Sequence, residues 1–69
     1  MLKWTVKFFM KNGDVIQGLY VGPETETMAV ARKLICGDLN NFVDLYGEDT
    51  SHHLFVKLGE IQAADITLR

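Results

Sequence analysis

Two apolar stretches of similar length flank the dipeptide Asn12-Gly13 near the N-terminus. Because Asn-Gly readily adopts the two positive φ angles of a type I′ turn, this pattern predicts a β-hairpin with a two-residue loop. In that register Lys7 faces Gly18 and Phe9 faces Ile16. Seven apolar side chains then share one face, which we interpret as the core face: Trp4, Val6, Phe8, Met10, Val15, Leu19 and Val21.

The other face of this hairpin is more apolar than a face exposed to water requires. It carries Phe9, Ile16 and Tyr20 among the polar residues Thr5, Lys7, Lys11 and Asp14. A three-residue loop ending in a left-handed Gly13 would shift the partners by one, and would set Lys7 against Gln17 and Phe9 against Val15. We prefer the two-residue loop because it gathers the apolar side chains on one side.

A helix is expected after the hairpin, beginning near Gly22-Pro23 and running to about Cys36. Proline near the first turn and two following carboxylates are typical of a helix start, and Gly37 is a typical stop. Apolar residues recur at three- and four-residue spacing and predict the buried stripe. The stripe consists of Met28, Ala31, Leu34 and Ile35, with Val30 at its edge.

The remainder of the chain alternates like strands. Residues 42–46 form a strand with Phe42, Asp44 and Tyr46 on one face and Val43 and Leu45 on the other. Residues 52–58 form the next strand, in which His53, Phe55 and Lys57 alternate with Leu54, Val56 and Leu58, and residues 47–51 form the turn between them. Gly59-Glu60 breaks the second of these strands, Ile61 returns to the core, and residues 64–68 form a brief last strand. The sequence therefore predicts a single α+β domain over residues 1–69, with one helix packed on one face of a mainly antiparallel sheet, in the order β-β-α-β-β(-β).

Length and charge narrow the classes of function. A core this small seldom supplies more than about 3–5 kcal/mol, so proteins of 69 residues commonly add disulfides, a metal or a partner subunit. The single Cys36 excludes an internal disulfide, and self-association is the expected supplement. Seven basic and nine acidic side chains give a net charge of −2, which provides no global positive field for a phosphate backbone.

The sequence also indicates the cellular compartment of the protein. Lys7 interrupts the N-terminal apolar run before it could serve as a secretion signal, and no apolar stretch approaches membrane-spanning length. One unpaired cysteine fits a reducing compartment. We therefore expect a cytoplasmic protein with no membrane partner.

His52-His53 is the feature that most suggests metal binding or catalysis. Adjacent residues on a strand point to opposite faces, so the two imidazoles do not easily converge on one ion. Asp44, Glu48 and Asp49 could join one histidine, which keeps a small metal-dependent enzyme as the least favoured alternative. Cys36, in the last helical turn, is interpreted as a small packed residue. We expect no catalytic residue, no metal and no cofactor.

The outer face of the hairpin is therefore the predicted contact surface. Glycine inside a strand, as at Gly18, weakens the strand, and it is typical of a bulge or of a place where another group approaches closely. The expected function is a non-enzymatic interaction module that self-associates, as a dimer first, with a different protein as the next alternative. A nucleic-acid-binding accessory protein could use the same aromatics and lysines, but two lysines are a weak electrostatic footprint. The candidate interface residues are Lys7, Phe9, Lys11, Ile16, Gly18 and Tyr20.

The layout as a whole resembles the small uncharacterised proteins carried by bacteriophages and prophages, chiefly of Gram-positive bacteria. The resemblance rests on the Asn12-Gly13 hairpin, the single short helix and the closing segments at residues 56–61 and 64–68. It covers the whole chain as a pattern. It implies a cytosolic and often oligomeric protein, and it assigns no role to any residue.

Overall fold

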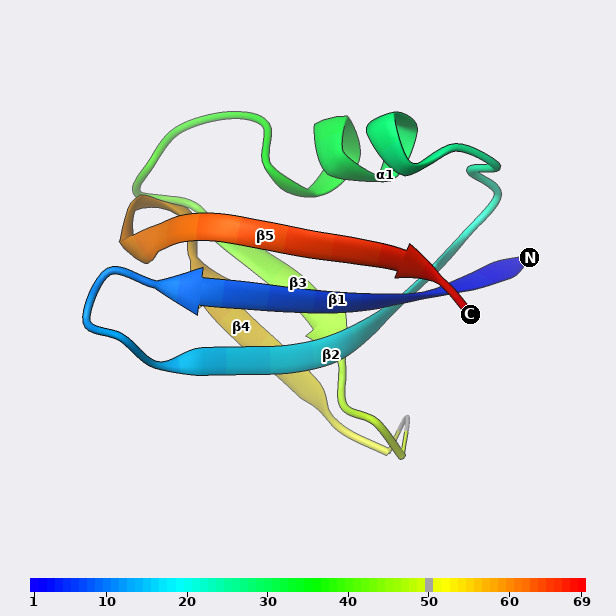
Figure 1. Cartoon of the computed structure of the whole chain (residues 1–69), viewed down its shortest axis with the longest axis horizontal. Helices are drawn as coiled ribbons and strands as arrows, with labels where there is room; N and C mark the ends of the chain where they lie inside the picture. The colour runs from blue at the N-terminus through cyan, green and yellow to red at the C-terminus, as the bar shows by residue number, and fades with distance from the viewer. Residues whose placement is uncertain (50) are drawn as a thin grey trace.

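The computed structural model describes residues 1–49 and 51–69, which form an antiparallel sheet and one α-helix (Figure 1). The predicted α+β class and element order are confirmed, and the last strand is longer than predicted. The elements are β1 (Leu2–Met10), β2 (Val15–Gly22), α1 (Thr27–Leu34), β3 (Phe42–Tyr46), β4 (His53–Lys57), one turn of 3-10 helix (Leu58–Glu60) and β5 (Ile61–Leu68).

The first hairpin has a three-residue loop, so the predicted two-residue loop is wrong. The Met10 amide donates to the Asp14 carbonyl (2.8 Å), and the Gly13 amide donates to the Met10 carbonyl (3.0 Å). Gly13 has a positive φ, of 95°. The side chain of Asn12 accepts a hydrogen bond from the Asp14 amide (3.0 Å), and this local contact favours the longer loop.

The longer loop shifts every pair by one residue and exchanges the two faces of β2. Lys7 faces Gln17 and Phe9 faces Val15, which is the register of the three-residue loop that we had considered as the alternative. Phe8 now faces Ile16, Val6 faces Gly18 and Trp4 faces Tyr20. Val15, predicted to lie in the core, is 55% exposed. Because side chains alternate between the two faces of a strand, a shift of one residue moves every side chain of β2 to the opposite face.

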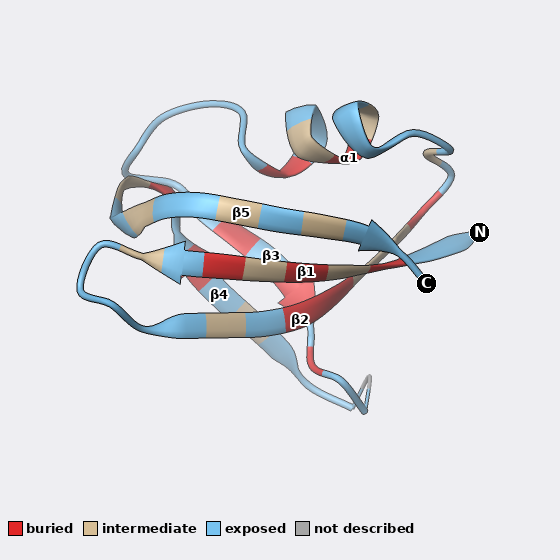
Figure 2. Cartoon of the chain, in the orientation of Figure 1, coloured by how far each residue is buried: buried red, intermediate tan, exposed pale blue. Residues whose placement is uncertain are grey.

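The strand order is β4-β3-β2-β1-β5, and the sheet folds over on itself. Within the described residues β2 pairs with β3 at one position, Leu19 with Tyr46, so the β3–β4 hairpin turns away and lies behind β1 and β2 in Figure 1. Burial alternates along β1 (Figure 2). The inner sides of the strands and of α1 close on one core: Trp4, Val6, Phe8, Val30, Leu34, Val43, Leu45, Val56 and Leu58.

The helix spans eight residues and is shorter than predicted. It begins after Glu26, whose extended backbone (ψ 143°) keeps Pro23 and the two carboxylates outside the first turn. A helix of two turns presents few side chains to the core, and these are Val30 (0% exposed) and Leu34 (7% exposed). Met28 and Ile35 are exposed, so the predicted stripe was wrong for both. Neither described helix is long and apolar enough to cross a membrane.

The second hairpin follows the predicted alternation. Val43 and Leu45 face the core, and their neighbours in β3 face outward. In β4, Val56 is buried while His53 and Phe55 are exposed. The turn between the strands is confirmed, except that Thr50 lies outside the described residues.

The last strand, β5, pairs with β1 along most of its length. Ile61, Ala64 and Ile66 pack against the core, which confirms that Ile61 returns to it. Leu68, at the end of the strand, is 49% exposed. The β1–β5 pairing places the C-terminal segment beside the first strand, where the Arg69 amide donates to the Lys3 carbonyl (3.0 Å).

Candidate interaction surface

The six predicted interface residues do not share one surface. Lys7 and Phe9 lie on the outer side of β1, and Lys11 lies in the hairpin loop. Ile16 and Tyr20 pack against the core cluster on the inner side. Their placement beside Phe9 is therefore corrected by the observed register, in which β2 presents Val15 and Gln17 to the outer side instead.

Gly18 is approached closely, but by its own chain. A β-carbon built on Gly18 would lie 2.8 Å from the Tyr46 carbonyl oxygen and 3.1 Å from the β-carbon of Leu45. Only a residue without a side chain allows β3 to cross β2 at this distance. The glycine therefore serves the folding-over of the sheet, and its predicted position opposite Lys7 is wrong.

The phenol of Tyr20 is held by the segment that precedes α1. Its hydroxyl lies 2.7 and 2.9 Å from the two carboxylate oxygens of Glu24. Burial of the ring, followed by the hydrogen bond to Glu24, raises the pKa of Tyr20 to about 12. These contacts give Tyr20 a structural role inside the chain and remove it from the hairpin's outer face.

The largest exposed aromatic side chains gather on the outer side of β3 and β4. Phe42 is 62% exposed and Phe55 is 67% exposed, although both belong to regular strands. The ring of His53 lies between two aromatic neighbours, 4.8 Å from the Tyr46 centroid and 6.2 Å from the Phe55 centroid. We call this surface the aromatic face; it consists of Phe42, Tyr46, His53 and Phe55.

Polar side chains lie within and beside the aromatic face, with Asp44 between Phe42 and Tyr46 on β3. The Nδ1 atom of His53 donates to Oδ1 of Asp44 (2.7 Å), and both side chains are about half exposed. Lys57 lies at the other end of β4, opposite Phe42. The sequence placed Phe42, Asp44 and Tyr46 on one face of their strand and His53, Phe55 and Lys57 on one face of the next, and the β3–β4 pairing joins the two sets. Alternation assigns side chains to a face of a strand and does not show which face remains exposed in the fold, so these residues were not predicted to form a contact surface.

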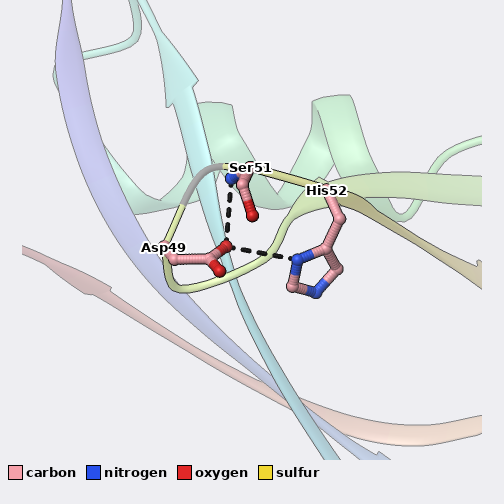
Figure 3. A network of polar contacts seen from close by, with 3 residues as sticks. All are labelled: Asp49, Ser51 and His52. Carbon is pink, nitrogen blue, oxygen red and sulfur yellow. Dashed lines mark hydrogen bonds and ion pairs between the residues drawn. The ribbon is translucent and has the colours of Figure 1, made fainter.

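The other histidine, His52, belongs to the turn between β3 and β4 (Figure 3). Oδ1 of Asp49 accepts a hydrogen bond from the Ser51 amide (3.0 Å) and lies 3.2 Å from Nδ1 of His52. The Ser51 backbone, above all, lowers the pKa of Asp49. The imidazole of His52 covers Gly47, where a β-carbon would collide with the ring. His52 thus stabilises the turn by local contacts.

The two imidazoles have different carboxylate partners, Asp44 for His53 and Asp49 for His52. In the part of the chain that the structure describes, no three histidine, cysteine or acidic side chains gather where they could hold a metal ion. Cys36 is exposed, and its predicted packing is wrong because α1 ends at Leu34 and leaves it in the connector.

The outer side of the first hairpin carries other apolar residues than predicted, because the observed register places Val15 and Leu19 there. Leu19 is buried there, and the Gln17 amide donates to a carboxylate oxygen of Glu48 in the turn between β3 and β4. Lys7 faces Asp65 across the β1–β5 pair, which places an opposite charge beside it. Phe9 is 40% exposed and has no aromatic neighbour among the described ring contacts.

Comparisons of the chain with protein-family models, with curated proteins and with solved structures found no match. A function for this chain must therefore be inferred from the chemistry of its described residues.

Proposed function

We propose that this chain is a small non-enzymatic interaction module that self-associates through the aromatic face. The observation that carries the proposal is the exposure of Phe42 and Phe55, at 62% and 67%, on adjacent strands of one sheet. Scattered single hydrophobic residues are normal on a surface, but a contiguous set is typical of an interaction site. This surface replaces the first hairpin, whose predicted anchors Ile16 and Tyr20 face the core.

The energetics favour such a role. Fully burying one phenylalanine side chain is worth about 1.5–3 kcal/mol, and each copy offers two. A domain of 69 residues has a small core, so an interface adds a substantial fraction to its stability. Aromatic anchors accompanied by polar groups are the usual arrangement of an interface, and here Asp44 lies within the aromatic face and Lys57 beside it.

Sedimentation velocity over a range of concentrations tests this proposal. We expect the unmodified chain to form a dimer at micromolar concentration, and Phe55→Glu or Phe42→Glu to weaken the dimer at least tenfold. The matched control is Val15→Glu, which places the same charge at a position 55% exposed on the first hairpin. A chain that stays monomeric at several hundred micromolar, or a dimer lost only in Val15→Glu, would overturn the proposal.

A nucleic-acid-binding role on the first hairpin has less support. Asp65 faces Lys7, and Tyr20 does not lie on that side to stack against a base. Fluorescence anisotropy with a labelled single-stranded oligonucleotide checks it. Binding at about 50 mM salt that falls steeply with added salt would favour this role over the first.

A further inference from the structure

The backbone of β4 is free along one side. β4 is an outer strand of the sheet and pairs with β3 alone among the described strands. The Gly47 amide donates to the His52 carbonyl (2.7 Å) and the Leu58 amide donates to the Asn41 carbonyl (2.9 Å). Because hydrogen-bonded pairs alternate in an antiparallel ladder, Leu54 and Val56 also point their polar groups toward β3.

The alternate residues of β4 must therefore point their amides and carbonyls away from the sheet. These residues are His53, Phe55 and Lys57, and the side chains of all three lie on the outer side. The free edge and the aromatic face thus meet along the same three residues. An unpaired strand edge is a template for pairing with another strand.

The opposite edge of the sheet is less suited to pairing. α1 packs beside β5, and it lies along that strand in Figure 1. The outward side chains of β5 are small or polar, as at Ala63, Asp65 and Thr67. Among the described elements, only β3 packs extensively beside β4, whose outward residues include the most exposed aromatic ring of the aromatic face.

We infer that a second copy of this chain pairs with β4 strand to strand, in antiparallel orientation and centred on Phe55. This inference rests on the proposed self-association and specifies its geometry. With the two Phe55 residues opposite each other, His53 of each copy faces Lys57 of the other. All three outward-pointing residues then pair, which gives up to about six backbone hydrogen bonds and joins two sheets into one.

The charges along β4 favour the antiparallel orientation. Asp44 lies 2.7 Å from His53 and places a carboxylate near one end of the strand, whereas Lys57 lies at the other end. Antiparallel pairing brings Lys57 of each copy toward the Asp44–His53 pair of the other. A parallel arrangement would set the two lysines side by side, and like charges directly opposite each other are destabilising.

The pairing also brings the aromatic rings together. Opposed residues of a hydrogen-bonded antiparallel pair have Cα atoms about 5.5 Å apart, so the two Phe55 rings would touch on the outer side. Cross-strand aromatic pairs stabilise sheets beyond the area that they bury. The contact between the copies then combines backbone pairing with two aromatic rings.

Residue-resolved hydrogen exchange at low and high protein concentration tests the geometry. We expect the amides of His53, Phe55 and Lys57 to gain at least tenfold protection in the dimer. The amides of Leu54 and Val56 serve as internal controls, since their bonds to β3 exist in the monomer. Protection that appears along β5 instead, or at none of the three outward amides, would overturn strand pairing.

A pair of substitutions at one position gives a second test. Lys57 has a φ of −72°, which proline accepts, and its amide points outward, so Lys57→Pro removes an edge donor and retains the β3–β4 pairing. Lys57→Gln removes the charge alone. We expect Lys57→Pro to weaken the dimer at least tenfold more than Lys57→Gln, and equal effects would overturn the inference.

The outcomes separate this inference from the proposed function. A dimer that is lost in Phe42→Glu and Phe55→Glu, but shows no protection of the outward amides, retains the aromatic face as the interface and overturns the strand pairing. A chain that remains monomeric in every measurement overturns both.

Discussion

The Tyr46 carbonyl oxygen lies 2.8 Å from the position that a β-carbon would occupy on Gly18. The two residues belong to β2 and β3, which pair at Leu19 and Tyr46 and then diverge. This crossing is where the sheet turns back on itself and where the second hairpin begins to cover the first. Gly18 therefore controls how closely β2 approaches β3, one of the two strands that carry the aromatic face.

Substitution of Gly18 by alanine should disturb this crossing. The nearest atoms belong to the backbone of Tyr46 and to the β-carbon of Leu45, neither of which can move without shifting the strand. We expect Gly18→Ala to lower the free energy of unfolding by about 1–3 kcal/mol, measured by urea denaturation. Gln62→Ala, at an exposed position, is the control and should change it by less than about 0.5 kcal/mol.

The face of the helix can be tested by two truncations. Leu34→Ala removes a side chain that is 7% exposed and should cost about 2–3 kcal/mol of stability. Met28→Ala truncates a side chain that is 60% exposed, and its cost should be within about 0.5 kcal/mol. Comparable losses from the two variants in thermal and chemical unfolding would contradict the observed face.

Gly13, in the loop of the first hairpin, is required for its backbone conformation and not for a close contact. A β-carbon on Gly13 would meet nothing within 4 Å, but the residue has a φ of 95°. Gly13→Ala should therefore destabilise the chain by about 1 kcal/mol through strain alone. Gly13→Asn should cost less, because asparagine tolerates positive φ better than alanine does. If denaturation showed alanine to be neutral, the three-residue loop would be wrong.

Stability should fall in alkaline solution through Tyr20. Its pKa is raised to about 12 from 10.0, so between these values the unfolded chain has lost the phenolic proton while the folded chain retains it. The contribution is complete below pH 10 and disappears as the pH rises toward 12. Tyr20→Phe should flatten this part of the stability profile measured by denaturation at several pH values. An unchanged slope would show that other groups control it.

Local patterns in the sequence determined much of the fold. The alternation in residues 42–46 predicted β3 and both of its faces, because the strand period is a property of the backbone itself. The turn signals placed each break between elements, and the α+β order followed from them. That Phe42, Asp44 and Tyr46 share one face was also a local inference, and it is correct.

Tertiary structure decided the register of the first hairpin, the buried side of the helix and the exposed surface, because each depended on small differences between competing arrangements. Asn12-Gly13 is compatible with a two-residue and a three-residue loop, and the choice moved Ile16 and Tyr20 from the outside to the core. Whether Val30 or Met28 faced inward depended on where a two-turn helix began. The folding-over of the sheet then decided which exposed side chains form one surface, because it arises from the close crossing at Gly18 and not from any periodicity.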